Sequence, residues 1–313
     1  MSYFNTGGVA CATDFDHSHA KGKTAIITGG ANGIGEGYAR ALVACGVHVV
    51  VADMDEGGGA KLEKEFPGLI KFIKCNVTVW ADQLALFNAA LSWSPSGRID
   101  TVIANAGISG GDSIFQNDIT QDQPEEPELN ILKVNLVGVL YTVKLALFFF
   151  RKQSTTGKAN CDQSLIFTGS LAGYLDVPGA PQYTSAKYGL RGLMKTLRRS
   201  EVQYCTRVNY IAPWWIRSTL LSKDAAKYLD TAGMAFATVD DAGQAVARIV
   251  STPSINGRAF GIVPRKIVST GYVDLDVDDY EEDSLLGKLG AQAVAINHRG
   301  SLNAAKQKTR TQW

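Results

Sequence analysis

Tyr183 and Lys187, four residues apart, are the pair in this sequence best suited to acid–base chemistry. On a helix they would lie on one face, one turn from each other. A free phenol has a pKa of about 10, and a nearby ammonium lowers that pKa by favouring the phenolate. The pair could then exchange a proton with a hydroxyl or carbonyl group. Such a pair is common on helices and is weak evidence by itself. Here Ser170 supports it, because this serine lies 13 residues before Tyr183, at the carboxyl end of a predicted strand. Ligands of open α/β sheets bind at that end of the strands.

A glycine-rich turn follows the first predicted strand and opens a helix, and the cofactor contacts expected there are Gly29, Asn32, Gly33, Ile34 and Gly35. Glycines let the backbone approach a pyrophosphate, and the helix N-terminus offers it N–H groups and partial positive charge. Asp53 ends the next strand, 18 residues after Gly35, and could accept hydrogen bonds from both ribose hydroxyls. Its carboxylate would repel a 2′-phosphate, and neither Asn32 nor Met54 supplies a cation. We therefore expect NAD rather than NADP; the alternative is a tight turn without a ligand.

Alternating strands and helices must position these residues. Continuous apolar runs predict seven strands, at 24–28, 47–52, 70–75, 99–104, 164–168, 208–211 and 259–263. Helical periodicity predicts helices at 36–45, 58–65, 81–93, 128–153, 182–203 and 240–250. Apolar runs of this kind are typical of strands buried on both faces. The sequence thus predicts an α/β fold, a Rossmann-type doubly wound parallel sheet of about seven strands with helices on both faces.

The chain divides into three expected parts. Residues 1–22 are predicted to form an N-terminal arm, and 23–264 a single dinucleotide-binding catalytic domain with a substrate loop at about 214–236. Residues 265–313 form a C-terminal extension, acidic at 273–283 and basic at its end. This pattern favours a solvated tail; a segment that folds over a neighbour or the substrate cleft is the alternative.

Composition excludes several classes of function. The 313 residues carry a formal net charge of +1, so binding to nucleic acid or to an anionic membrane is not expected as the main activity. The apolar stretch 134–150 is interrupted by Asn135, Gly138 and Lys144 and reads as too short and too polar to span a membrane. No signal peptide is evident. Five cysteines without a CxxC pair indicate a reducing, cytoplasmic location and no zinc site, and no metal is expected.

The glycine spacing, TG-xxx-G-x-G over residues 28–35, resembles that of the short-chain dehydrogenase/reductase family in its compact single-domain branch. The similarity covers about residues 22–264 and extends to motifs in the family's order, which are Asn76-Val77, Asn105-Ala106-Gly107, Ser170 and Tyr183-xxx-Lys187. In that family the first of these contacts adenine, and the second supports the central sheet beside the cofactor. The sequence is most similar to the NAD-using, 15-hydroxyprostaglandin dehydrogenase-like members.

The resemblance implies a catalytic tetrad of Asn135, Ser170, Tyr183 and Lys187. Ser170 would hydrogen-bond the substrate oxygen and steady its developing charge. Lys187 would also bind the nicotinamide ribose, and Asn135 would hold a water that connects Lys187 to solvent. The alternatives are a cap for Ser170 and a polar helix residue facing solvent for Asn135.

One departure from the family follows the strand at 208–211. The family has Pro-Gly there, whereas this chain has Pro213-Trp214. Pro213, Ile216 and Ser218 still fit the expected contacts to the cofactor. The large indole must line the substrate cleft or reshape the loop, and the predicted substrate contacts are Tyr174, Trp214, Trp215 and Leu220.

The expected activity is NAD-dependent interconversion of a secondary alcohol and a ketone on a bulky, largely apolar small molecule, such as a secondary metabolite. Two alternatives remain: an enzyme of the same fold that isomerises or cyclises a natural product, and a protein that senses NAD without turnover. In the family, helices equivalent to 128–153 and 182–203 form a dimer interface, which implies a homodimer, with a homotetramer as the alternative.

Overall fold

One eight-stranded sheet, in the order β3-β2-β1-β4-β5-β6-β7-β8, runs through the computed structural model. The structure describes residues 3, 5, 7–155 and 162–296, so Cys161 and the basic end of the chain lie outside the described residues. Strands β1 to β7 are parallel, and β8 is antiparallel to β7. Their bounds are β1 Thr24–Thr28, β2 His48–Asp53, β3 Ile70–Lys74, β4 Thr101–Ala104, β5 Gln163–Thr168, β6 Thr206–Pro213, β7 Ala259–Ile262 and β8 Tyr272–Asp274.

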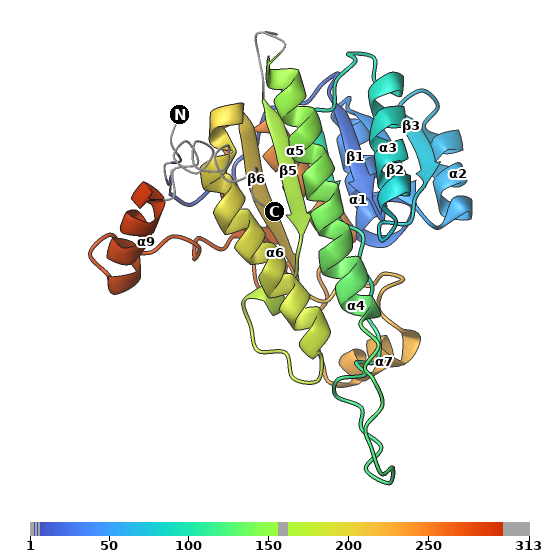
Figure 1. Cartoon of the computed structure of the whole chain (residues 1–313). Coiled ribbons are helices and arrows are strands. Elements are labelled where there is room, and N and C mark those ends of the chain that lie inside the picture. The colour runs from blue at the N-terminus through green and yellow to red at the C-terminus, as the bar shows by residue number, and fades with distance from the viewer. Residues whose placement is uncertain (1–2, 4, 6, 156–161, 297–313) are drawn as a thin grey trace, which may run out of the picture.

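Helices cover both faces of this sheet (Figure 1). The described helices are α1 Gly33–Ala44, α2 Glu56–Glu65, α3 Trp80–Trp93, α4 Asn130–Leu132, α5 Val139–Thr155, α6 Pro181–Ser200, α7 Lys223–Thr231, α8 Val239–Ser251 and α9 Leu285–Ile296. Short turns complete them: the π-helical η1 Lys133–Gly138 and the 3₁₀ turns η2 Leu171–Gly173 and η3 Val202–Tyr204. Side chains of α1, α2 and α8 join one buried cluster, and those of α3, α5 and α6 join the other. The predicted doubly wound sheet is confirmed.

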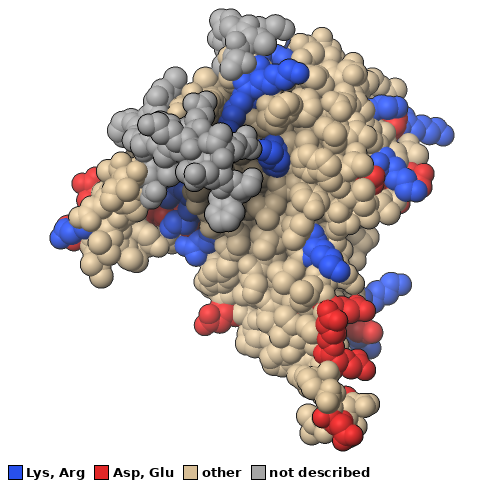
Figure 2. Space-filling view, in the orientation of Figure 1, with Lys and Arg blue, Asp and Glu red and all other residues tan. Residues whose placement is uncertain are grey.

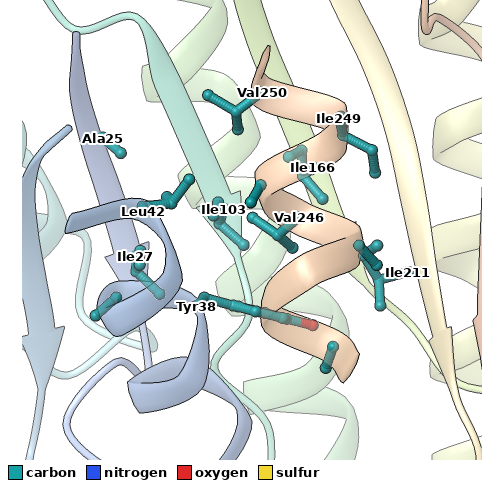
Figure 3. Close-up of a cluster of buried hydrophobic side chains, with 14 of the residues drawn as sticks. Ala25, Ile27, Tyr38, Leu42, Ile103, Ile166, Ile211, Val246, Ile249 and Val250 are labelled. Atoms are coloured by element: carbon teal, nitrogen blue, oxygen red, sulfur yellow. The ribbon is translucent and has the colours of Figure 1, made fainter. Parts of the chain in front are cut away.

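The first cluster shows how apolar strands hold the helices in place (Figure 3). Ile27, Ile103 and Ile166 project from β1, β4 and β5 onto one face of the sheet. Tyr38 of α1 and Val246 of α8 pack against them, and all five side chains are fully buried. At about 25 cal/mol for each Å² of apolar surface removed from water, such packing holds the two helices against the sheet.

The helix predicted at 128–153 is divided by its backbone into α4, η1 and α5, which run on without a break. The continuous span Asn130–Ser154 has 25 residues and a mean hydropathy of 1.7 in its most apolar window, enough by length and composition to cross a membrane. In the structure its inner side, including Val143, Ala146 and Phe150, is buried in the second cluster on the sheet. The prediction that this stretch is too short and too polar to span a membrane is therefore wrong by length and composition. In the structure the helix nevertheless packs on the sheet.

The solvated tail predicted beyond residue 264 is not what the structure shows for its first part. Tyr272–Asp274 forms β8 and extends the sheet beyond the expected seven strands. The acidic side chains there have buried partners: Arg258 Nε donates to Asp274 Oδ2 at 2.7 Å. The predicted arm also packs on the body, since Val9 N donates to the same carboxylate oxygen at 2.9 Å. In α9, by contrast, no residue is buried.

Candidate active site

Two positions of the glycine-rich turn between β1 and α1, Gly29 and Gly35, have no room for a side chain. Gly29 has φ +64°, and a Cβ there would lie 2.7 Å from Ala106 Cα. A Cβ on Gly35 would lie 2.0 Å from the Gly29 carbonyl oxygen. Asn32, the N-cap of α1, makes no side-chain cap bond, so the amides of the first turn of α1 are not capped by their own N-cap residue. This geometry suits an anion at the start of α1.

The segment Asn105-Ala106-Gly107 is tied directly to that turn. Asn105 Nδ2 donates to the carbonyl oxygens of Thr28 at 3.0 Å and Gly29 at 2.8 Å. The amides of Asn105 and Ala106 donate to Thr28 Oγ1 at 3.1 and 3.2 Å. The ends of β1 and β4 therefore hold each other in place beside the predicted cofactor site.

Asp53 lies at the carboxyl end of β2, as predicted. Its Oδ2 accepts from Ala31 N at 3.0 Å, so the carboxylate is fixed against the glycine-rich turn. The cation opposite it in the sheet register, Lys74, binds Glu56 at 2.6 Å.

Asn76 and Val77 follow β3, beside the end of β2. Asn76 Oδ1 accepts from Thr78 N at 3.0 Å, which forms an Asx turn. Val77 is buried, and its carbonyl accepts from Gln83 Nε2 at 2.6 Å. The structure thus places the predicted adenine contacts at the same edge of the sheet as Asp53.

Ser170, Tyr183 and Lys187 come together at the carboxyl end of β5. The Ser170 hydroxyl lies close enough to the Tyr183 phenol to lower its pKa. Lys187 is 4% exposed, and its Nζ donates to Thr168 O at 3.0 Å and lies 5.2 Å from the centre of the Tyr183 ring. The predicted cap role of Ser170 is also present, because its Oγ accepts from Ala172 N at 3.1 Å.

The protonation of the pair differs from the expectation. Burial lowers the pKa of Lys187 to about 8. Burial raises the pKa of Tyr183, and the nearby Ser170 hydroxyl opposes that rise only in part. The lowered Tyr183 pKa expected from the sequence is therefore not seen in the chain by itself, because the loss of hydration on burial is the largest influence on this phenol.

Asn135 lies in the π-helical turn η1 and is fully buried. Its Oδ1 accepts from Ile108 N at 2.8 Å, and its Nδ2 donates to Ile108 O at 2.9 Å. The alternative of a solvent-facing amide is wrong. Both ends of the amide hold the loop that follows Gly107, and η1 packs against α6, the helix of the catalytic pair. Single π-turns inside helices are frequent at functional sites.

The segment after β6 returns over the glycine-rich turn. Pro213 ends β6, and its carbonyl accepts from Ser170 Oγ at 3.4 Å. Ile216 is buried and pairs with Ala237. Ser218 lies so close to the turn that a Cβ on Gly33 would be 3.2 Å from Ser218 Cβ. Ser218 thus lies beside the glycine-rich turn despite the tryptophan after Pro213, whereas the contacts of Pro213, Ile216 and Ser218 to a cofactor stay a prediction.

The predicted substrate residues take different places. Trp214 packs on the first buried cluster, whereas Trp215 and Leu220 are each 39% exposed. Tyr174 has a partner that the sequence did not predict: its hydroxyl donates to Asp278 Oδ2 at 2.6 Å, so the C-terminal segment holds this side chain.

Tyr210 of β6 is a residue that sequence reasoning missed. Its buried hydroxyl accepts from Ser170 N at 3.3 Å and donates to the Lys187 carbonyl at 3.1 Å, so it joins the two catalytic elements. A Cβ on Gly169 would lie 1.8 Å from the Tyr210 ring, so that glycine makes the contact possible. The Gly169-Ser170 dipeptide after a strand was the available signal.

Comparison with known proteins agrees with this geometry. The family model described as short chain dehydrogenase matches residues 23–229. The 5'-hydroxyaverantin dehydrogenase of Dothistroma septosporum is 32% identical over 289 residues, which cover 87% of this chain and 92% of that protein. The NADP-dependent dehydrogenase M3 of a Phoma species is also 32% identical over 289 residues, with 87% and 84% covered.

A solved structure shares the fold. The 3-ketoacyl-(acyl-carrier-protein) reductase from Brucella melitensis, complexed with NADH, superposes with a TM-score of 0.67 and 26% identity, covering 77% of this chain and 97% of that one. The closer similarity to 15-hydroxyprostaglandin dehydrogenase-like members stays a prediction. From the matched region and these relatives, the chain belongs to the short-chain dehydrogenase/reductase family of oxidoreductases.

Proposed function

We propose that this protein is an NAD-dependent oxidoreductase that interconverts a secondary alcohol and a ketone on a bulky, largely apolar small molecule. One observation carries the proposal. Ser170, Tyr183 and the buried amine of Lys187 lie together at the carboxyl end of β5, the end of the sheet at which the glycine-rich turn and Asp53 also lie. Ligands of open α/β sheets bind at this end of the strands.

The chain's residues fit a dinucleotide. The cradle at Gly29, Gly33 and Gly35 would be filled by any Cβ, and the carboxylate of Asp53 is fixed at the neighbouring strand end. The remaining proposed contacts are Asn32, Ile34, Asn76, Val77, Asn105, Ala106, Gly107, Tyr183, Lys187, Pro213, Ile216 and Ser218. NAD supplies an acceptor for the hydrogen of the alcohol carbon, taken as hydride.

Proton transfer is the work of the chain's own residues. In alcohol oxidation Tyr183 takes the hydroxyl proton, and Ser170 hydrogen-bonds the same substrate oxygen. Lys187 favours the phenolate when it carries charge, and its low pKa of about 8 lets it pass a proton onward near neutral pH. Asn135 holds the adjoining loop and η1 in place, beside the path proposed for that proton.

The choice of NAD over NADP rests on Asp53. Its carboxylate would repel a 2′-phosphate, Met54 beside it is apolar, and Lys74 is engaged by Glu56. Relatives differ on this point, since one is named for NADP and one solved neighbour holds NADH. We expect a higher kcat/KM with NAD, and we expect Asp53→Ala to reduce that preference. A wild-type preference for NADP would contradict this assignment.

The substrate proposal rests on exposed aromatic and aliphatic side chains near the site. Trp215 and Leu220 lie at the start of the segment 214–236, and each is partly open to solvent. A relative is named for 5'-hydroxyaverantin. We propose a bulky, largely apolar substrate, recognised by Trp214, Trp215, Leu220 and Tyr174.

Turnover of a panel of secondary alcohols with NAD, followed by NADH formation, tests the function. Tyr183→Phe should abolish NADH formation, whereas NAD should still bind through the contacts at the glycine-rich turn and Asp53. A product formed without net oxidation would favour isomerisation or cyclisation instead. NAD binding without turnover of any alcohol or ketone would favour a sensor.

The assembly proposed is a homodimer in the cytoplasm, with no membrane or nucleic-acid partner. Figure 2 shows few charged side chains on the face formed by α5 and α6. That face exposes Leu140 and Phe148 of α5 and Tyr188 of α6, which are 42%, 56% and 42% exposed. Sedimentation of the purified protein tests this, with a homotetramer as the alternative.

A further inference from the structure

A long loop between β4 and α4, residues 105–129, projects from the body of the protein (Figure 1). One buried carboxylate fastens it to the helix that carries Tyr183. Asp112 is 4% exposed; its Oδ2 accepts from Gln182 N at 2.7 Å, and its Oδ1 accepts from Gln182 Nε2 at 3.0 Å. Gln182 directly precedes Tyr183 in the chain.

This contact replaces a cap that α6 lacks. Ala180, the N-cap of α6, has no side chain that could cap the helix, and Pro181 occupies its first turn. Asp112 therefore supplies both an acceptor and a negative charge at the N-terminus of α6, from 70 residues away in sequence. Gln182 is 1% exposed, and its Nε2 also donates to Glu128 O at 2.9 Å, so the far end of the loop is held too.

The same loop reaches the substrate side of the site. Ser109 Oγ donates to the Leu220 carbonyl at 2.9 Å, and Ile108 is held by Asn135 on both its backbone groups. Beyond these contacts the loop is solvent-facing, and Figure 2 shows acidic side chains gathered toward the tip. Asp112 is therefore the side chain through which this largely exposed loop binds the helix that carries Tyr183.

We propose that Asp112 is a positioning residue. It fixes the first turn of α6, and with it the Tyr183 hydroxyl, and it keeps the loop against the segment that begins at Trp214. The inference rests on the proposed function, because it takes Tyr183 as the group that exchanges the proton. Most of the proposed NAD contacts lie on other elements, in the turn after β1 and at the ends of β2, β3 and β6, so cofactor binding should depend on Asp112 much less than turnover does.

The test compares Asp112→Ala and Asp112→Asn with Asp118→Asn. Asp118 lies on the same loop, is exposed, and accepts only within the loop, for example from Thr120 N at 2.9 Å. With the best alcohol of the panel, Asp112→Ala should lower kcat/KM roughly ten-fold or more, as expected for a lost hydrogen bond to a charged group. Both kcat and the KM for alcohol should change, the Kd for NAD should stay within about two-fold, and Asp112→Asn should be intermediate. Asp118→Asn should match wild type.

A second readout needs no turnover. Amide hydrogen exchange over residues 182–187 should be faster in Asp112→Ala and unchanged in Asp118→Asn, and Gln182→Ala gives a milder change if Asp112→Ala does not fold. Unchanged exchange would overturn the positioning role even if the wild type turns over no alcohol, which would separately refute the proposed function. An equal loss of kcat/KM in Asp118→Asn, or an equal loss of NAD binding in Asp112→Ala, would overturn it as well.

Discussion

Replacing Lys187 by methionine should make the protein more stable at neutral pH while abolishing turnover. The amine of Lys187 is buried, and burial lowers its pKa from the usual 10.5 to about 8. At pH 7 the native state must therefore carry a charge that it solvates poorly. Methionine has a similar unbranched shape and no charge, so it removes that cost together with the proton path.

The size of the effect follows from the same shift. A difference of ~2.5 pH units between the folded and unfolded pKa corresponds to ~3 kcal/mol, at ~1.4 kcal/mol for each unit. Losing the hydrogen bond from Nζ to Thr168 O costs about 1 kcal/mol. The net gain at pH 7 is about 2 kcal/mol, or on the order of 4 °C in Tm.

The two pKa values of Lys187, folded and unfolded, determine whether the stability of the wild type rises or falls with pH. Between about pH 8 and pH 10.5 the unfolded chain still binds the Lys187 proton, whereas the folded chain has released it. Because the unfolded state binds more protons there, the stability of the wild type rises with pH through this window. The advantage of Lys187→Met should accordingly shrink above pH 8, vanish near pH ~9.5 and be reversed by about 1 kcal/mol at pH ~10.5, where only the lost hydrogen bond remains.

Urea unfolding at a series of pH values, with NADH formation measured in parallel, checks this. Lys144→Met is the matched control, since Lys144 is exposed on α5 and its replacement should not produce the same pH-dependent gain. A Lys187→Met protein that is less stable than wild type at pH 7, or whose stability difference does not vary with pH, would refute the reasoning.

Three further outcomes are expected. Gly35→Ala should abolish NAD binding in calorimetry, because its Cβ would lie 2.0 Å from a backbone oxygen of the same turn, whereas Gly192→Ala, with nothing within 4 Å, should leave binding unchanged. Asp278→Asn should lower the free energy of unfolding by about 3 kcal/mol in urea, since it breaks a buried ion pair. Ser170→Ala should move the rise of kcat/KM for alcohol oxidation to higher pH, because it removes the hydroxyl that lowers the pKa of Tyr183.

Much of the fold was predictable because strands that are buried on both faces of a sheet appear in the sequence as continuous apolar runs. The run Val49-Val50-Val51 indicated β2 without ambiguity. The predicted 208–211 was too short for β6, which spans Thr206–Pro213, because Arg207 is polar in sequence yet buried against Asp162, Nε to Oδ1 at 2.6 Å. The strand β8 has three residues in an acidic stretch, and its pairing with β7 depends on long-range contacts that no local pattern shows.

The site, too, has residues that the sequence predicts and residues that only the structure shows. Tyr183, Lys187 and Ser170 were found because their chemistry depends on local spacing. Asp112 and Asp278 were not, because their partners lie 70 and 87 residues away and only the folded chain brings them together. The error over the Tyr183 pKa has a related cause, since the sequence shows which charges are near in the chain and does not show how much water each one loses.

The two outer strands of the sheet bear on how this protein avoids polymerising. An open edge strand offers unpaired amides and carbonyls to any other chain, and short or lysine-bearing edges discourage that pairing. At one border β8 covers β7 and is itself only three residues long. At the other, β3 carries Lys71 and Lys74, each held by a glutamate of α2. We therefore expect any self-association to use helical faces, and the sheet to resist growth into fibrils.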